Sequence, residues 1–301
     1  SSSRGYMFAL GKYYRLFYGS VSVKMNRIVA HESNTYVLLK HQGYMTISDE
    51  NGIDDPSDFL LEMYASSGNR CRTLVKFDSN GSPVYARSLI GSGNDYGSYE
   101  DDLAIDLTGN VYFSASYSGY DESLLRTEMN LQTYSQTTLA TFASPNGDFR
   151  MTVTKLNGSD GSFLYARTLS GLKVSGSEYV NIEKIAIDKD NNVIACGNID
   201  DTSGSETSTI TVQIMDENDT VLETLPPTRR SGFVMKFNDV GDLQFVKFIQ
   251  TSIPYSDTDS KIIVSAIDTD QDGTVHVVGT YNYKPAEDPY NMSSSGSDWY
   301  N

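Results

Sequence analysis

Residues 153–171 read VTKLNGSDGSFLYARTLSG, and this stretch decides the fold because it recurs along the chain. Residues 74–91 read LVKFDSNGSPVYARSLIG, residues 234–249 read VMKFNDVGDLQFVKFI, and residues 13–19 keep only the second part, YYRLFYG. In the three longer copies, apolar-rich segments flank a turn of Gly with Asn or Asp, which is a strong signal for a β-hairpin. The chain therefore contains four copies of one β-rich unit.

A second hairpin is predicted after each of these. Residues 103–113 read LAIDLTGNVYF, and the matching segments are IAIDKDNNVI at 185–194, AIDTDQDGTVHVVG at 266–279 and IVAHESNTYVL at 28–38. Two hairpins in succession predict a four-stranded antiparallel meander, and copies of a meander bury their faces by stacking around an axis. We therefore predict an all-β fold, a β-propeller built from four-stranded antiparallel blades, with at least about 45% strand and under about 10% helix.

We interpret residues 1–301 as a single β-propeller-like region, with repeats at about 6–70, 71–149, 150–231 and 232–301. The repeats carry insertions between blades, at about 41–70, 118–149, 200–231 and 281–301. Two of the insertions contain a predicted additional hairpin, at residues 131–142 and 209–225. Insertions at matching places project from the same side of an assembly, so we predict that they form the contact surface.

The repeat resembles the SBBP-type β-propeller repeat. Val75-Lys76-Phe77, the Gly-rich loop at 91–96 and the segment 104–112 carry the resemblance best, and it covers most of residues 6–280. The resemblance implies the propeller fold but little about activity, because propellers host many functions. The repeats of this chain are longer than those of that family.

Four units are few for a closed propeller, and three arrangements follow. The chain is a segment of a longer polypeptide, it closes as a four-bladed ring, or it pairs with a second copy or stacks into an open array. Each repeat buries its faces only against the next one, so the terminal units must meet each other, another part of a parent chain or another subunit. The apolar run Tyr6-Met7-Phe8-Ala9-Leu10 opens the first unit without a capping device.

The composition of the chain disfavours two classes of function, nucleic-acid binding and membrane insertion. The net charge is −16, which disfavours binding to nucleic acid and to anionic lipid. No run of eighteen apolar residues occurs in the sequence, so we predict no membrane insertion. Two cysteines, Cys71 and Cys196, cannot form a disulfide framework, and Cys196 falls in a predicted buried strand. The two cysteines therefore do not distinguish an oxidising from a reducing compartment.

The sharpest candidate site is Asp268-Thr269-Asp270-Gln271-Asp272-Gly273. Carboxylates at alternate positions before a Gly turn are typical of Ca²⁺ loops, so Asp268, Asp270 and Asp272 are candidate calcium ligands. The competing interpretation is an ordinary hairpin turn, because the equivalent turns after Asp106 and Asp188 carry fewer acids.

Other polar groups have simpler interpretations. An acidic loop and its counterpart in the fourth unit are predicted to be solvated or to bind cations weakly; they contain Asp95, Glu100, Asp101, Asp102, Asp257 and Asp259. The aligned basic residues Arg15, Arg87, Arg167 and Lys247 are predicted to pair with acids across neighbouring blades, the alternative being a ligand-binding ring. Four sequons in predicted turns are candidate glycosylation sites, at Asn80, Asn157, Asn218 and Asn291.

The sequence carries no sign of an enzyme. The histidines, His31, His41 and His276, show no metal-ligand spacing, and neither a Gly-x-Ser-x-Gly elbow nor a phosphate loop is present. We predict a non-enzymatic structural or adhesive protein, secreted or on a cell or particle surface, whose partners are other proteins or its own copies. The alternatives are a carbohydrate- or protein-binding receptor module and a propeller hydrolase or lyase.

Overall fold

The computed structural model describes residues 4–10, 13–19, 22–48, 59–64, 70–90, 101–117, 122–127, 136–143, 150–172, 178–201, 210–226, 231–251, 261–282 and 292–294. Within these ranges the chain forms twenty-three β-strands and no helix, so the all-β prediction is confirmed. The same residues therefore contain no helix that could cross a membrane.

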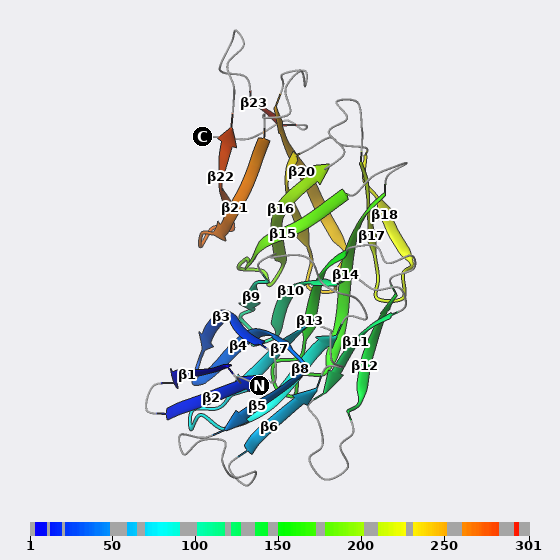
Figure 1. Ribbon diagram of the computed structural model, residues 1–301. Coiled ribbons are helices and arrows are strands. Elements are labelled where there is room, and N and C mark those ends of the chain that lie inside the picture. Colours follow the sequence, from blue (N-terminus) through cyan, green and yellow to red (C-terminus); the bar gives the residue numbers. More distant parts are fainter. Residues whose placement is uncertain are drawn as a thin grey trace.

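Five antiparallel sheets follow one another along the molecule (Figure 1). Sheet I contains β1 (Arg4–Leu10), β2 (Tyr13–Gly19), β5 (Tyr44–Ser48) and β6 (Phe59–Tyr64). Sheet II contains β3 (Ser22–His31), β4 (Asn34–Gln42), β7 (Arg70–Phe77), β8 (Pro83–Ile90), β11 (Glu122–Thr127) and β12 (Thr138–Ala143).

The three later sheets contain six, five and two of the described strands. Sheet III contains β9 (Leu103–Ile105), β10 (Val111–Tyr117), β13 (Arg150–Leu156), β14 (Phe163–Leu172), β17 (Thr211–Met215) and β18 (Val221–Thr224). Sheet IV contains β15 (Glu178–Ile187), β16 (Val193–Asp201), β19 (Ser231–Phe237), β20 (Leu243–Thr251) and β23 (Met292–Ser294). Sheet V contains β21 (Lys261–Thr269) and β22 (Val275–Asn282).

Sheets II and III show the full plan, which is six strands contributed by three hairpins. In sheet III the inner hairpin is β9–β10, the middle hairpin is β13–β14 and the outer hairpin is β17–β18. Between the middle and outer hairpins the chain leaves to build the inner hairpin of the next sheet, β15–β16, and then returns. Neighbouring sheets are therefore interlaced by the backbone.

The prediction of four-stranded blades with separate insertions is wrong. The inserted hairpins pair with the last strand of the preceding middle hairpin, as β5 does with β2, β11 with β8 and β17 with β14. They satisfy backbone groups that would otherwise form an open sheet edge. The strands of residues 71–149 are accordingly divided between sheets II and III.

The two hairpins predicted inside the insertions fare differently. The hairpin predicted at 209–225 is present as β17–β18. The arms of the other hairpin are residues 122–127 and 138–143, so the prediction of a hairpin within 131–142 placed its first arm wrongly. Residues 128–135 lie outside the described part of the chain.

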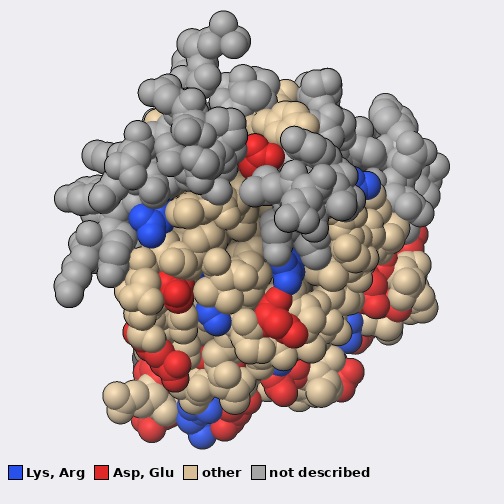
Figure 2. Space-filling view, turned by 90° about the horizontal axis from the view of Figure 1, so that it is seen from below, with Lys and Arg blue, Asp and Glu red and all other residues tan. Residues whose placement is uncertain are grey.

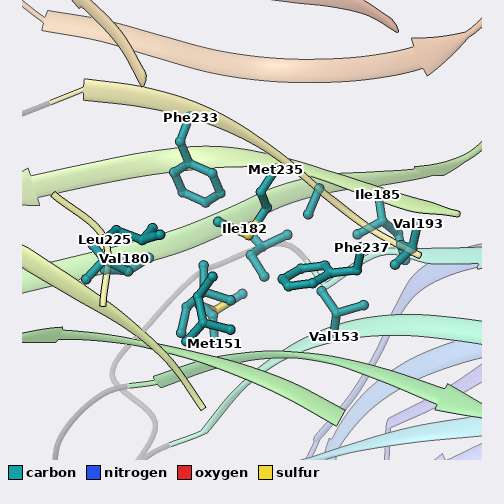
Figure 3. Packing of buried hydrophobic residues seen from close by; sticks show 14 of the residues in the cluster. Met151, Val153, Val180, Ile182, Ile185, Val193, Leu225, Phe233, Met235 and Phe237 are labelled. Carbon is teal, nitrogen blue, oxygen red and sulfur yellow. The ribbon is translucent and has the colours of Figure 1, made fainter. Parts of the chain in front are cut away.

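The hydrophobic core consists of successive layers between the sheets, because the central strands are buried on both faces. In β4, Tyr36 and Leu38 join the layer toward sheet III, whereas Val37 and Leu39 join the layer toward sheet I. This alternation follows from the two-residue period of a strand. The layer between sheets III and IV is the largest, and Phe233, Met235 and Phe237 of β19 reach into it together with Met151 and Val153 of β13 (Figure 3).

Sheet I and sheet V lie at opposite ends of this arrangement (Figure 1). No closed ring is formed by the described residues, and neither end sheet has six strands there. The described sheets form an open stack, and association with a second copy or with the rest of a longer chain stays a prediction.

Candidate functional site

The inner hairpins of sheets III, IV and V have turns of the same geometry. The candidate calcium ligands lie in and beside the turn of sheet V. The carboxylate of Asp270 accepts hydrogen bonds from the backbone N–H groups of Asp272 at 3.0 Å and Thr274 at 2.8 Å. Asp106 and Asp188 make the same pair of bonds in sheets III and IV. Each acidic residue therefore closes its own turn by accepting N–H groups two and four residues ahead.

Further bonds occupy the acids of this loop. Asp268 accepts the N–H of Thr269 at 2.8 Å, and His276 lies 3.2 Å from the second carboxylate oxygen of Asp270. Within the residues that the structure describes, no group of three or more His, Cys, Asp or Glu side chains is arranged to hold a metal ion. Calcium binding by Asp268, Asp270 and Asp272 stays a prediction from the sequence.

Three of the four aligned basic residues, all arginines, connect neighbouring sheets through backbone carbonyls. Arg15 Nε donates to the carbonyl of Gly81 at 2.6 Å, and Arg87 Nε donates to that of Gly161 at 2.7 Å. The third member of the series, Arg167, repeats the bond at 2.6 Å. Each acceptor lies in the middle-hairpin turn of the next sheet, so these arginines connect neighbouring sheets through backbone carbonyls.

A glycine is required at these turns for two reasons. Gly241 has φ 88°, and a Cβ there would lie 2.7 Å from Nη2 of Arg167 and 2.9 Å from the ring of Tyr165. That ring in turn lies below the guanidinium, 4.9 Å from ring centroid to Cζ. Backbone conformation and the close approach of the preceding sheet therefore both exclude a side chain.

Lysines of the middle hairpins form a second row of contacts between sheets. Lys76 Nζ donates to the carbonyl of Gly158 at 2.6 Å, and burial lowers its pKa. Lys155 donates to the carbonyl of Asp239 at 2.9 Å and forms an ion pair with its carboxylate. Tyrosine rings surround both ammonium groups, so each cation is stabilised by aromatic faces as well as by oxygen atoms; the rings are those of Tyr36, Tyr85, Tyr112 and Tyr165.

The acidic loop before β9 is not solvated at its C-terminal end. Asp101 and Asp102 are each 1% exposed, so the sequence-based expectation is wrong for these two residues. Asp101 lies 3.2 Å from Nε of Arg72 and accepts a 2.7 Å hydrogen bond from Asn26. The basic partner offsets the cost of burying the carboxylate. Asp95, Glu100, Asp257 and Asp259 lie outside the described residues.

Asp102 connects three sheets. Its carboxylate lies 3.2 Å from Arg27 Nε of sheet II and accepts the N–H of Ile185 of sheet IV at 3.0 Å. The aspartate itself precedes β9 of sheet III. The polar layer, defined here as Arg27, Arg72, Asp101, Asp102 and Ser116, therefore joins sheets II and III; Arg72 Nη2 also donates to Ser116 Oγ.

A buried cysteine and histidine lie side by side in sheet II. Cys71 Sγ is 2.8 Å from His41 Nε2, which is also 2.8 Å from the hydroxyl of Thr73. Burial lowers the pKa of His41 to about 4 and raises the pKa of Cys71. Both groups are therefore neutral at pH 7, and a thiolate nucleophile is disfavoured. The spacing of these residues in the sequence did not predict this contact.

Both cysteines are free and buried. Cys196 is fully buried in β16, as its apolar surroundings in the sequence predicted, and burial raises its pKa to about 12. Of the remaining histidines, His31 ends β3 and His276 is in β22. Asn80 and Asn218 are exposed in turns, Asn157 is half-buried in a turn, and Asn291 lies outside the described residues.

No protein-family model and no curated protein matches this chain. The resemblance to the SBBP-type repeat therefore rests on the repeat motifs alone.

The outer hairpin of sheet III combines a firm attachment with exposed apolar groups. Arg150 of β13 forms an ion pair with Asp219 in the turn of this hairpin. Its last strand, β18, is exposed along its whole length, with Val221 46% and Leu222 50% exposed. Successive side chains point to opposite faces of a strand, so apolar groups are presented on both faces of this sheet edge.

Charged side chains are dispersed on one face of the molecule. On the face seen from below in Figure 2, acidic and basic side chains are interspersed among neutral ones. Mixed surfaces of this kind favour solubility over recognition of a single highly charged ligand. The outer edge of β18 is therefore the stronger candidate contact site among the described residues.

Proposed function

We propose that the protein is a non-enzymatic structural or adhesive protein of a secreted or surface-exposed material, in which the interlaced sheets form a scaffold and the outer hairpins make contacts. The observation that carries this proposal is the outer strand β18, which exposes Val221 and Leu222 beside a backbone edge that pairs with no other described strand. Exposed edges and apolar side chains together favour the addition of a strand or an apolar surface from a partner.

The internal charges support a scaffold. Lys155, Arg72 and Asp101 are almost completely buried and are occupied by contacts between sheets. Groups used in this way are withdrawn from substrates and stabilise one arrangement of the sheets. The neutral Cys71–His41 pair gives the same indication, because neither member is ionised at pH 7.

Immunogold electron microscopy of the native material tests the location. Antibodies raised against residues 1–301 are expected to label intact cells or particles on the outside. Label that appears only after permeabilisation would contradict the proposal.

A binding experiment tests the contact surface. Fluorescently labelled residues 1–301 are titrated onto the native material, and Leu222→Asp is expected to weaken binding about tenfold, because one buried leucine contact contributes roughly 1.5–3 kcal/mol. Leu107→Asp is the matched control, since Leu107 is 72% exposed in the turn of an inner hairpin. Equal binding by the two variants would remove β18 from the contact surface.

A further inference from the structure

The two ends of the stack lack complementary parts of one sheet. In sheets II, III and IV the second strand of the inner hairpin pairs antiparallel with the first strand of the middle hairpin, as in β4–β7, β10–β13 and β16–β19. Within the described residues, β1 of sheet I has a strand only on its β2 side, and sheet V consists only of its inner hairpin. Among the described residues, sheet I therefore contains no inner hairpin, and sheet V contains only an inner hairpin.

Sheet V exposes a residue that the other sheets bury. The fourth residue of β10 is Ser114, that of β16 is Cys196 and that of β22 is Val278. Ser114 and Cys196 are completely buried, whereas Val278 is 64% exposed. Val278 is exposed because no described sheet packs against the far side of β22.

Sheet II shows the matching exposure at the other end of the molecule. Ile28 occupies the position of Leu103 in sheet III and Ile185 in sheet IV, three residues before the first residue of the inner turn. Leu103 is 2% and Ile185 5% exposed, and both belong to layers that include the preceding sheet. Ile28 is 44% exposed, because the sheet before it has no inner hairpin among the described residues.

The charges of the two ends are also complementary. Among the described residues of 4–31, four are basic and none is acidic. Sheet V, residues 261–282, contains three acidic residues and one basic residue. Opposite charges on two surfaces steer them together and select the orientation in which they meet.

We propose that chains of residues 1–301 assemble head to tail, with the β21–β22 hairpin of one copy filling the inner position of sheet I of a second copy. The resulting sheet would have the six strands of sheets II and III. The contact repeats an interface that the chain already forms between its own sheets. It uses the ends of the stack and not the outer hairpins, so it is independent of the proposed contact function.

The repeats specify the register of this junction. In sheet IV, Val234 pairs with Cys196 on one side and, on the other, with the basic residue that aligns with Arg15. In sheet I, Phe8 pairs with Arg15. The partner of Phe8 across the junction is therefore Val278 of the second copy, with β22 antiparallel to β1. Because the two surfaces differ, the contact is heterologous and successive copies form open chains.

Sedimentation velocity on residues 1–301 tests the proposal. The average mass is expected to rise with concentration above the chain mass of 33.3 kDa. Val278→Lys and Ile28→Lys each block one end, and both change exposed residues, so the fold is retained. Each variant alone is expected to be monomeric. An equimolar mixture is expected to form dimers, because each variant still offers the end that the other lacks.

The response to ionic strength separates this junction from other kinds of association. Raising the ionic strength from about 0.05 M to about 0.5 M is expected to weaken it, since the attraction between the ends is screened; adhesion through apolar patches alone would strengthen. The proposal is overturned by a wild-type chain that stays monomeric, by association that survives in either variant, or by a mixture of the folded variants that does not dimerise.

Discussion

The junction between sheets II and III and the junction between sheets IV and V solve the same packing problem with different chemistry. At the first junction, Arg27 and Arg72 of sheet II meet Asp102 and Asp101, the two residues before β9 of sheet III. The Arg72–Asp101 pair is buried, with side chains 2% and 0% exposed. Charge therefore holds these two sheets together beside their apolar layer.

The second junction is apolar. Ile194, Cys196 and Val234 of sheet IV pack against Val264 and its neighbours in sheet V. One side-chain amide adds direction: Asn198 donates to the carbonyl of Val264 at 3.1 Å and accepts its N–H at 2.8 Å. The repeat geometry thus tolerates either chemistry, and the two junctions should respond differently to substitution and pH.

Removing one member of the buried ion pair is expected to have the largest effect. Arg72→Met leaves Asp101 buried without its cation, which costs about 3–5 kcal/mol of unfolding free energy. Arg72→Met with Asp101→Asn is expected to recover at least half of this loss, because no charge then remains buried. Urea denaturation of the three proteins measures the difference. A double variant as unstable as the single one would show that the pair acts through shape alone.

Acid is expected to act next, through His41 in sheet II. Its pKa of about 4 lies below the usual 6.5, so the unfolded chain binds more protons between these pH values. The contribution of neutral His41 to the free energy of unfolding is therefore fully present above about pH 6.5. It decreases by about 3 kcal/mol as the pH falls to about 4. Unfolding of wild type and His41→Gln is compared across this range, with His31→Gln as control. The wild type is expected to lose more stability than His41→Gln, and equal losses would refute the prediction.

At the apolar junction, Asn198→Ala is expected to have a smaller and more local effect. The backbone of Val264 loses both of its bonds to Asn198, which costs about 1–3 kcal/mol. Hydrogen exchange of β21 and β22 should accelerate, while exchange of β9 and β10 serves as the internal reference. Acceleration spread equally over both hairpins would mean that sheet V is not attached through this side chain.

The glycine turns test the contact between sheets by steric means. Gly241→Ala adds a clash with Arg167 to the cost of its positive φ, whereas Gly109→Ala has the same φ cost, with φ 85° and its nearest neighbour, His31, 3.8 Å away. Gly241→Ala is therefore expected to lower the melting temperature more than Gly109→Ala. Equal shifts would assign the whole effect to the backbone.

Calcium is expected to have the smallest effect. If Asp268, Asp270 and Asp272 bind the ion, millimolar Ca²⁺ raises the melting temperature by mass action. Asp270→Asn keeps an oxygen for the turn but removes a charge, so the rise should disappear; Asp188→Asn is the matched control in sheet IV. No calcium-dependent shift in the wild type would leave the loop as an ordinary turn.

Local patterns predicted the hairpins but not their partners. The Gly and Asn turns at 78–82 and 106–110 decide nearby pairing, and these hairpins were found from the sequence. The partner of an inserted strand is not local, because β17 could complete the edge of either neighbouring sheet. The burial of Asp101 was missed for the same reason, since its cation, Arg72, is 29 residues away. The available signal was Arg72 itself, a basic residue just before the repeat segment that begins at Leu74.

The central claim is that each outer hairpin returns to the preceding sheet, and a disulfide tests it most directly. Ser170 of β14 and Gln213 of β17 face each other across the sheet. Ser170→Cys with Gln213→Cys is expected to oxidise to one intramolecular disulfide, because paired residues in neighbouring strands lie within the Cα separation that a disulfide spans. Gln213→Cys alone, with Cys71 and Cys196 buried, should stay reduced. A double variant that keeps both new thiols free while folded would contradict the interlaced arrangement.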